Sequence, residues 1–274
     1  MSDTEPVLAR IAAALEAMVP GTPGSTDWLT APAYVWDGSA RAVPTISAPP
    51  LALLKGIDAQ KERIIANVTR LAAGHAAHDM LLWGARGMGK SALLRAAVAA
   101  AQADKPGALA LVQIGPDALG TLSALFSALG QADRRFLVFI DDLGFEDGDS
   151  SGPRALRSWL EGGVEARPGN VRLAVTSNRR AIVPRHLSEQ DDPINPRDAV
   201  DDQLALADRF GLSLGFHACT QDDYLAIVAG YAAAHGLDWS AAAALEWSKR
   251  RGARSGRVAW QFVTELAGTA GRQL

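Results

Sequence analysis

Short apolar runs alternate with helical patterns through the middle of the chain. Five runs have the length of buried strands, at 79–83, 108–114, 136–140, 171–176 and 212–216. Apolar residues at helical spacing precede the first run, as in Ile57, Ile64 and Val68, and similar helical segments separate the later runs. Strands that alternate with helices predict βαβ units, and therefore a parallel sheet flanked by helices.

The N-terminal part of the chain follows other patterns. Residues 7–18 predict a short helix. The turn residues at 20–24 terminate this helix. Residues 27–50 follow neither the helical nor the strand period, and we expect an extended connector there. Its aromatic residues are expected to pack on the main body: Trp28, Tyr34 and Trp36.

Beyond residue 220 the strand pattern stops. Three segments with helical spacing remain, at 221–235, 240–250 and 256–268. The sequence therefore predicts three parts: an N-terminal helix and connector over 1–50, an α/β P-loop core over 51–218, and a small all-helical lid domain over 219–274.

The composition excludes several classes of protein. With 274 residues, of which 48% are hydrophobic, the chain can bury a substantial core and is not disordered throughout. The formal net charge of -3 gives no overall field that attracts nucleic acid or an anionic membrane. Cys219 is the only cysteine, and we expect neither a signal peptide nor an apolar run of about 20 residues that spans a membrane. These features predict a cytoplasmic protein.

A glycine-rich loop carries the clearest chemical signal. It fits the pattern G-x-x-x-x-G-K-[ST] and consists of Gly84, Ala85, Arg86, Gly87, Met88, Gly89, Lys90 and Ser91. A predicted strand precedes the loop, and a predicted helix follows it from Ala92. Glycines let backbone N–H groups close around phosphates, and the helix N-terminus adds partial positive charge. We predict that the loop binds ATP, with Lys90 on the β and γ oxygens and Ser91 on Mg²⁺.

Carboxylates follow the buried run at 136–140. Asp141 comes first, at the position where P-loop ATPases hold Mg²⁺, and we expect it to act through water. Asp142 comes next and is the candidate general base that orients the attacking water. Glu146 is an alternative base, although its surroundings are also typical of a solvated acidic loop.

Later polar residues also fit a triphosphate. Asn178 follows the run at 171–176 and can orient water against the γ-phosphate, although an Asn there also fits a turn or a helix cap. Arg209 directly precedes the last run, where it can reach a phosphate in a neighbouring subunit as an arginine finger. Arg254 and Arg257 lie at the start of the last helix, from which a guanidinium can fold back over the γ-phosphate.

In this order, the elements resemble those of the AAA+ ATPases over nearly the whole chain. The segment 54–60, which contains Ile57, looks like the one that packs against adenine, and 208–211 looks like the arginine-finger box. The segment 255–259 is similar to the second sensor, which favours Arg257. The resemblance implies a P-loop ATPase with a helical lid, with ATP and Mg²⁺ as ligands, and a homo-oligomer (ring or dimer) in which the finger acts on a neighbour.

A narrower resemblance is to a bacterial family catalogued as domain of unknown function 815 and described as predicted ATPases. It rests on 82–87, 176–180 and 251–257. It implies a fold and a nucleotide, but no substrate. One position departs from the wider pattern, because Asp142 stands where many AAA+ members have glutamate. Helicase loaders and replication initiators also carry paired aspartates there, and we expect hydrolysis to be slow or to need help.

Functions of different classes follow from these motifs. The first is an ATP hydrolase in which the γ-phosphate draws the lid toward the core, and the lid relays this movement to an unknown protein partner. The second is a nucleotide-gated loader or adaptor on DNA with little turnover, which the paired aspartates and the basic stretch 249–257 favour. A small-molecule kinase is the least favoured, because no acceptor pocket is recognisable. The acidic segment 181–203 stays unassigned, and we expect a loop that orders upon assembly.

Overall fold

The computed structural model describes residues 26–143, 156, 159–160, 167–178 and 208–274. Three predicted features lie outside the described residues: the helix at 7–18, Glu146 and the segment 181–203. Within the described ranges, no helix combines the length and the apolar character needed to cross a membrane.

Seven strands of the described chain form one sheet, in the order β2-β1-β4-β5-β6-β3-β7. The five strands predicted from the sequence are present as β3 (Met80–Gly84), β4 (Leu109–Ile114), β5 (Arg135–Ile140), β6 (Val171–Ser177) and β7 (Leu212–Phe216). They pair in parallel, as their alternation with helices predicts. Their carboxyl ends therefore lie along one edge of the sheet, where ligands bind in such folds.

Part of the predicted extended connector forms two strands of the sheet, which the sequence pattern did not predict. β1 (Ala33–Trp36) pairs in parallel with β4, and β2 (Ala40–Val43) pairs antiparallel with β1. Each strand has only four residues, too few to display a period, and pairing with the sheet decides the conformation. The aromatic side chains pack as predicted, and their exposed fractions are at most 7%: Trp28, Tyr34 and Trp36.

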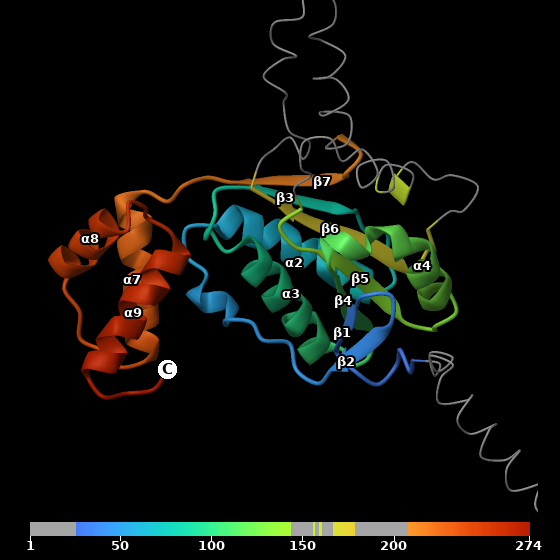
Figure 1. Cartoon of the computed structure of the whole chain (residues 1–274), viewed down its shortest axis with the longest axis horizontal. Coiled ribbons are helices and arrows are strands. Elements are labelled where there is room, and N and C mark those ends of the chain that lie inside the picture. The colour runs from blue at the N-terminus through green and yellow to red at the C-terminus, as the bar shows by residue number, and fades with distance from the viewer. Residues whose placement is uncertain (1–25, 144–155, 157–158, 161–166, 179–207) are drawn as a thin grey trace, which may run out of the picture.

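Helices cover both faces of the sheet (Figure 1). The core contains η1 (Leu51–Leu53), α2 (Asp58–Ala72), α3 (Lys90–Asp104), η2 (Pro116–Thr121) and α4 (Leu122–Gly130). Side chains alternate along β5, so Leu137 and Phe139 join the cluster that contains the buried faces of α2 and α3. Phe136 and Val138 join the opposite cluster, with α4. The central strand thereby separates two apolar layers.

The C-terminal helices form a core of their own. They are α7 (Gln221–Ala234), α8 (Ala241–Arg250) and α9 (Gly256–Thr269), and Figure 1 shows them as a separate group beyond the end of β7. Their buried side chains contact one another, Tyr224, Val228 and Val263 among them. A capping box starts α7, since Thr220 Oγ1 accepts a hydrogen bond from the N–H of Asp223 and the Asp223 carboxylate accepts one from the N–H of Thr220.

Candidate functional site

The glycine-rich loop lies between the carboxyl end of β3 and the start of α3. Three of its glycines have positive φ angles, 122° at Gly84, 75° at Gly87 and 86° at Gly89. A Cβ at position 84 would lie 2.1 Å from the carbonyl oxygen of Phe216, which accepts a hydrogen bond from the N–H of Ala85 at 2.8 Å. The loop turns in direct contact with β7, and only glycine fits at its first position.

Lys90 begins α3, and its side chain is directed back into the loop. Its ammonium group donates to the carbonyl oxygens of Gly84 at 2.8 Å and Ala85 at 2.9 Å, and Oδ1 of Asn178 lies 3.5 Å away. Burial lowers the pKa of Lys90 below its ordinary value, while the two nearby aspartates oppose this shift. A buried ammonium group at a helix N-terminus is a strong attractor for an anion.

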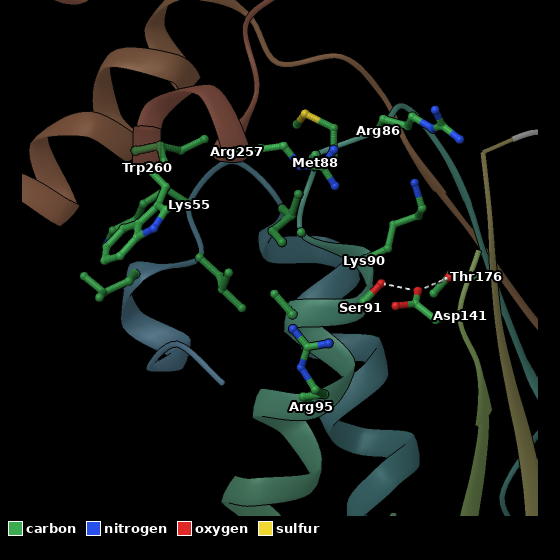
Figure 2. Close-up of a pocket in the computed structure, with 18 of the residues that line it drawn as sticks. Lys55, Arg86, Met88, Lys90, Ser91, Arg95, Asp141, Thr176, Arg257 and Trp260 are labelled. Atoms are coloured by element: carbon green, nitrogen blue, oxygen red, sulfur yellow. Dashed lines mark hydrogen bonds between the residues drawn. The ribbon is translucent and has the colours of Figure 1, made fainter. Parts of the chain in front are cut away.

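Ser91 and Thr176 share one carboxylate oxygen. Ser91 Oγ donates to Asp141 Oδ1 at 2.6 Å, and Thr176 Oγ1 donates to the same oxygen at 2.7 Å (Figure 2). Thr176 Oγ1 also accepts a hydrogen bond from the N–H of Asp142 at 2.8 Å. The end of β5 is therefore tied to both α3 and β6. The hydroxyl of Ser91 and the carboxylate of Asp141, both oxygen donors of the kind that Mg²⁺ binds, lie together as the sequence suggests.

Side chains from two neighbouring elements hold the carboxylate of Asp142. Asn178 Nδ2 donates to its Oδ1, and Nη2 of Arg86 lies 3.4 Å from its Oδ2. Asp142 has a φ of 52°, in the left-handed region, which aspartate tolerates better than most other side chains. The candidate base, Asp142, and Asn178, which is predicted to orient water, are therefore in direct contact.

A cavity of about 680 Å³ lies along the loop. Figure 2 shows Arg86, Lys90 and Asp141 toward one end of it, and Lys55 and Trp260 toward the other. Cationic side chains in its lining outnumber acidic ones, five against two: Lys55, Arg86, Lys90, Arg95 and Arg257 against Asp141 and Asp142. This excess of positive charge favours an anionic ligand.

The end of the cavity away from the carboxylates is largely apolar. The segment predicted to contact adenine reaches it through Leu54 and Ile57, both buried. The lid contributes Ile227, Tyr231 and Trp260, and the rings of Tyr231 and Trp260 meet edge to face with their centroids 5.1 Å apart. An apolar end with aromatic walls suits a flat heterocyclic base.

The lid touches the phosphate loop directly. The N–H of Arg257 donates to the carbonyl oxygen of Gly87 at 3.2 Å. Ser255 Oγ caps the same helix by accepting from the N–H of Val258 at 3.3 Å, and a Cβ at position 87 would lie 2.9 Å from this hydroxyl. Of the two candidate sensor arginines, Arg257 lines the cavity, while Arg254 is an exposed residue of the preceding turn.

Arg209 lies at the end of the sheet where the parallel strands begin, whereas the cavity lies at their carboxyl ends. It precedes β7, whose first residue, Leu212, donates its N–H to the carbonyl oxygen of Asp79, next to the start of β3. The two strands run parallel, so the length of the five-residue β3, about 16 Å, separates this edge from the loop. Within one subunit, the structure does not bring Arg209 to the other predicted site residues.

Several residues that line the cavity carry no signal in the sequence. Arg95 reaches it from α3, where its Nε donates to the carbonyl oxygen of Ser47 at 3.0 Å, and Tyr231 belongs to an ordinary buried helix face. Trp260 is different, because it lies three residues after Arg257 and must share a helix face with it. That spacing is a signal from which Trp260 can be predicted.

The parallel sheet, the phosphate loop and the helical lid define the class, an AAA+ P-loop ATPase fold. Similar solved structures include the RuvB Holliday junction branch migration motor of Thermotoga maritima, with a TM-score of 0.54 and 16% identity over 81% of this chain and 66% of that one. The ORC1 protein of Aeropyrum pernix in complex with DNA has a TM-score of 0.51 and 15% identity over 75% of this chain and 57% of that one. Domain III of the Thermotoga maritima replication initiation protein DnaA has a TM-score of 0.51 and 12% identity over 84% of this chain and 89% of that one. At these identities the likeness shows the fold alone, and the chain spans just under two-thirds of RuvB.

The chain belongs to the family described as protein of unknown function (DUF815), whose model matches residues 29–270. This match confirms the narrower resemblance drawn from the sequence. No curated protein matches the chain.

Proposed function

We propose that the cavity binds Mg·ATP and that the protein hydrolyses it to move the lid against the core. One observation carries the proposal. Lys90 and Ser91 are successive residues, and the first directs an ammonium group into the loop while the second donates to Asp141 at 2.6 Å. A cation for phosphate and a pair of oxygen ligands for Mg²⁺ are thereby adjacent at one helix N-terminus.

The triphosphate has several partners in this arrangement. The loop amides and the start of α3 face its oxygens, and Lys90 exchanges its contacts with the carbonyls of Gly84 and Ala85 for contacts with phosphate. Arg257, on the lid, meets the same anion from the other side of the loop. The base lies between the apolar segment before α2 and the rings of Tyr231 and Trp260.

The residues at the start of α3 and after the end of β5 fit a magnesium site. Ser91 and Asp141 supply oxygen ligands, and Thr176 holds the Asp141 carboxylate in place through a hydrogen bond of 2.7 Å. Mg²⁺ held by these residues would neutralise charge that develops on the transferred phosphoryl group.

Hydrolysis then uses the second carboxylate. Asp142 takes a proton from the attacking water. Asn178 contacts the Asp142 carboxylate and orients both this carboxylate and the water. The oxygen of water bonds to the γ-phosphorus, the bond to the bridging oxygen breaks, and ADP and inorganic phosphate leave. Loss of the γ-phosphate removes an anion that holds Arg257, so the lid moves away from the core and acts on a macromolecular partner.

Assembly completes the site. Arg209 lies near the amino-terminal ends of the parallel strands, about a strand length from the glycine-rich loop of the same chain. It can therefore contact a nucleotide phosphate only in a neighbouring subunit. We therefore propose that the active form is a homo-oligomer, a dimer or a ring. We also propose that the chain is divided as the sequence predicts, into an N-terminal helix and connector, a P-loop core and a helical lid.

The test is calorimetric titration with Mg·ATP, together with an assay of released phosphate. Wild-type protein should bind and turn over ATP, and Lys90→Ala should weaken binding by about 10-fold to 100-fold, as the loss of a charged hydrogen bond does. Lys105→Ala, an exposed change at the other end of α3, is the matched control. No binding heat with folded wild-type protein would falsify the proposal.

The second candidate function is nucleotide-gated binding to DNA, and one observation favours it. The last turn of α8 and the segment that joins it to α9 expose four cations within six residues: Lys249, Arg250, Arg251 and Arg254. DNA affinity that depends on ATP and falls steeply with salt would support it, and Arg251→Ala together with Arg254→Ala should reduce the salt slope by about 2. An affinity that is undetectable at low salt dismisses it.

A further inference from the structure

Arg86 contacts a carboxylate as well as the cavity. It occupies the third position of the glycine-rich loop, and its Nη2 lies 3.4 Å from Oδ2 of Asp142. Both residues line the cavity. Figure 2 shows the guanidinium at the same end as Lys90 and Asp141, where the triphosphate lies under the proposed function.

The backbone of Asp142 is fixed more firmly than its carboxylate. Thr176 holds the backbone, because its Oγ1 accepts from the N–H of Asp142 and its carbonyl accepts from the N–H of Leu143, both at 2.8 Å. The carboxylate is then positioned by the side chains of Asn178 and Arg86, one on each oxygen. Removal of Arg86 leaves one of these two restraints.

The ion pair is built to exchange partners. The side chains of Arg86 and Asp142 are 72% and 58% exposed, so water and salt weaken their attraction. Arg86, Lys90 and Arg257 all line the same cavity. Burial lowers the pKa of Lys90 most, and the charges of Arg86 and Arg257 lower it further. A triphosphate in their midst competes strongly with one exposed carboxylate for the guanidinium.

We propose that Arg86 is a positioning residue that is shared between two anions, the Asp142 carboxylate and a nucleotide phosphate. When phosphate takes the guanidinium, Asp142 keeps its contact with Asn178 and its second oxygen faces the attacking water. Nucleotide binding thereby readies the candidate base. This inference rests on the proposed function, because it needs a nucleotide in the cavity.

A double-mutant cycle on binding tests the exchange without relying on hydrolysis. Calorimetry with Mg·AMP-PNP gives the Kd of wild type, Arg86→Ala, Asp142→Asn and the double variant. Asp142→Asn frees the guanidinium and should tighten binding by about threefold or more, and this gain should be clearly smaller when position 86 is alanine. Arg86→Lys, which keeps the charge without the planar fork, should retain part of the gain.

A matched control is available on the lid. Arg250 and Glu246 form an equally exposed ion pair at 3.6 Å, away from the cavity, so Arg250→Ala and Glu246→Gln should show no coupling on nucleotide binding. Thermal unfolding verifies that each variant is folded. An equal effect of Asp142→Asn in both Arg86 backgrounds overturns the exchange while leaving the proposed function intact. Failure of wild type to bind either nucleotide overturns the proposed function itself.

Discussion

The backbone N–H of Arg257 donates a hydrogen bond to the carbonyl oxygen of Gly87 across 3.2 Å. This bond joins the first turn of α9 to the middle of the phosphate loop. The approach is close, since a Cβ on Gly256 would lie 3.1 Å from the same carbonyl oxygen. Displacement of α9 breaks this bond and carries the guanidinium of Arg257 away from the cavity at the same time. Arg257 therefore links the position of the lid to the phosphate loop through both its backbone N–H and its guanidinium group.

The first glycine of the loop should tolerate no side chain. A Cβ at Gly84 meets the backbone of β7 at 2.1 Å, in addition to a φ of 122°. We expect Gly84→Ala to lower the free energy of unfolding by more than about 3 kcal/mol. Gly107→Ala is the control, because Gly107 has a φ of 79° with no atom within 4 Å, and it should lower the same quantity by only about 1 kcal/mol. Urea unfolding measures both, and equal losses would contradict the steric argument.

The hydroxyl of Ser91 should matter for Mg²⁺ more than for the nucleotide. Ser91→Ala removes a proposed ligand and the hydrogen bond to Asp141, so turnover should require about 10-fold more Mg²⁺. Thr176→Val removes only support for the same carboxylate and should have a smaller effect. Titration of Mg²⁺ at saturating ATP checks the order of the two variants. Binding of ATP without metal should change little, and an equal loss there would argue that Ser91 shapes the loop instead.

Arg209 should act only on a neighbouring subunit. Arg209→Ala is expected to abolish turnover and to leave the Kd for nucleotide unchanged, since Arg209 is distant from the cavity of its own chain. Lys90→Ala abolishes turnover through the loop instead. Mixed oligomers of the two inactive variants should recover about a quarter of wild-type turnover, because random assembly pairs an intact loop with an intact finger at that frequency. If the mixture stays inactive although it exchanges subunits, Arg209 is not a finger.

The lid should lose stability at high pH because of a buried phenol. Tyr224 is fully buried and donates to the carbonyl oxygen of Ala244 at 3.1 Å, and burial raises its pKa from 10.0 to about 12. The folded state holds this proton more tightly than the unfolded state does. Stability from the neutral phenol is therefore complete below pH 10 and is lost as the pH rises toward 12, by on the order of 2 kcal/mol.

Tyr224→Phe isolates this effect. The variant should be less stable at neutral pH by about 1 kcal/mol, because it lacks the hydrogen bond to Ala244, and it should lose less stability than wild type between pH 10 and 12. Tyr231, whose pKa burial also raises, is present in both proteins and cancels in the comparison. Denaturant unfolding at a series of pH values gives the free energy of unfolding of wild type and of the variant. If this free energy falls with pH equally in the two proteins, the assignment to Tyr224 is contradicted.

Local patterns were sufficient for much of the fold. The five long strands and the three C-terminal helices follow from apolar periodicity, and the phosphate loop follows from its glycines and their position between a strand and a helix. β1 and β2 did not follow, because four residues display no period and their conformation depends on pairing with β4. The site shows the same division. Asp141 directly after a buried strand is visible in the sequence, whereas Arg95 and Tyr231 reach the cavity only through helix packing.

The chemistry at the loop follows from local sequence, since Gly84, Lys90 and Ser91 lie within eight residues. Glycine lets backbone N–H groups approach phosphate, the ammonium group binds phosphate, and the hydroxyl group binds Mg²⁺. The packing of the strands and of the lid sets which distant groups join them. It brought Arg257 to the loop through a backbone contact, and it placed Arg209 at the far edge of the sheet. Parallel pairing and lid packing bury apolar surface over many residues. The positions of these two charged side chains follow from that burial rather than from their local sequence.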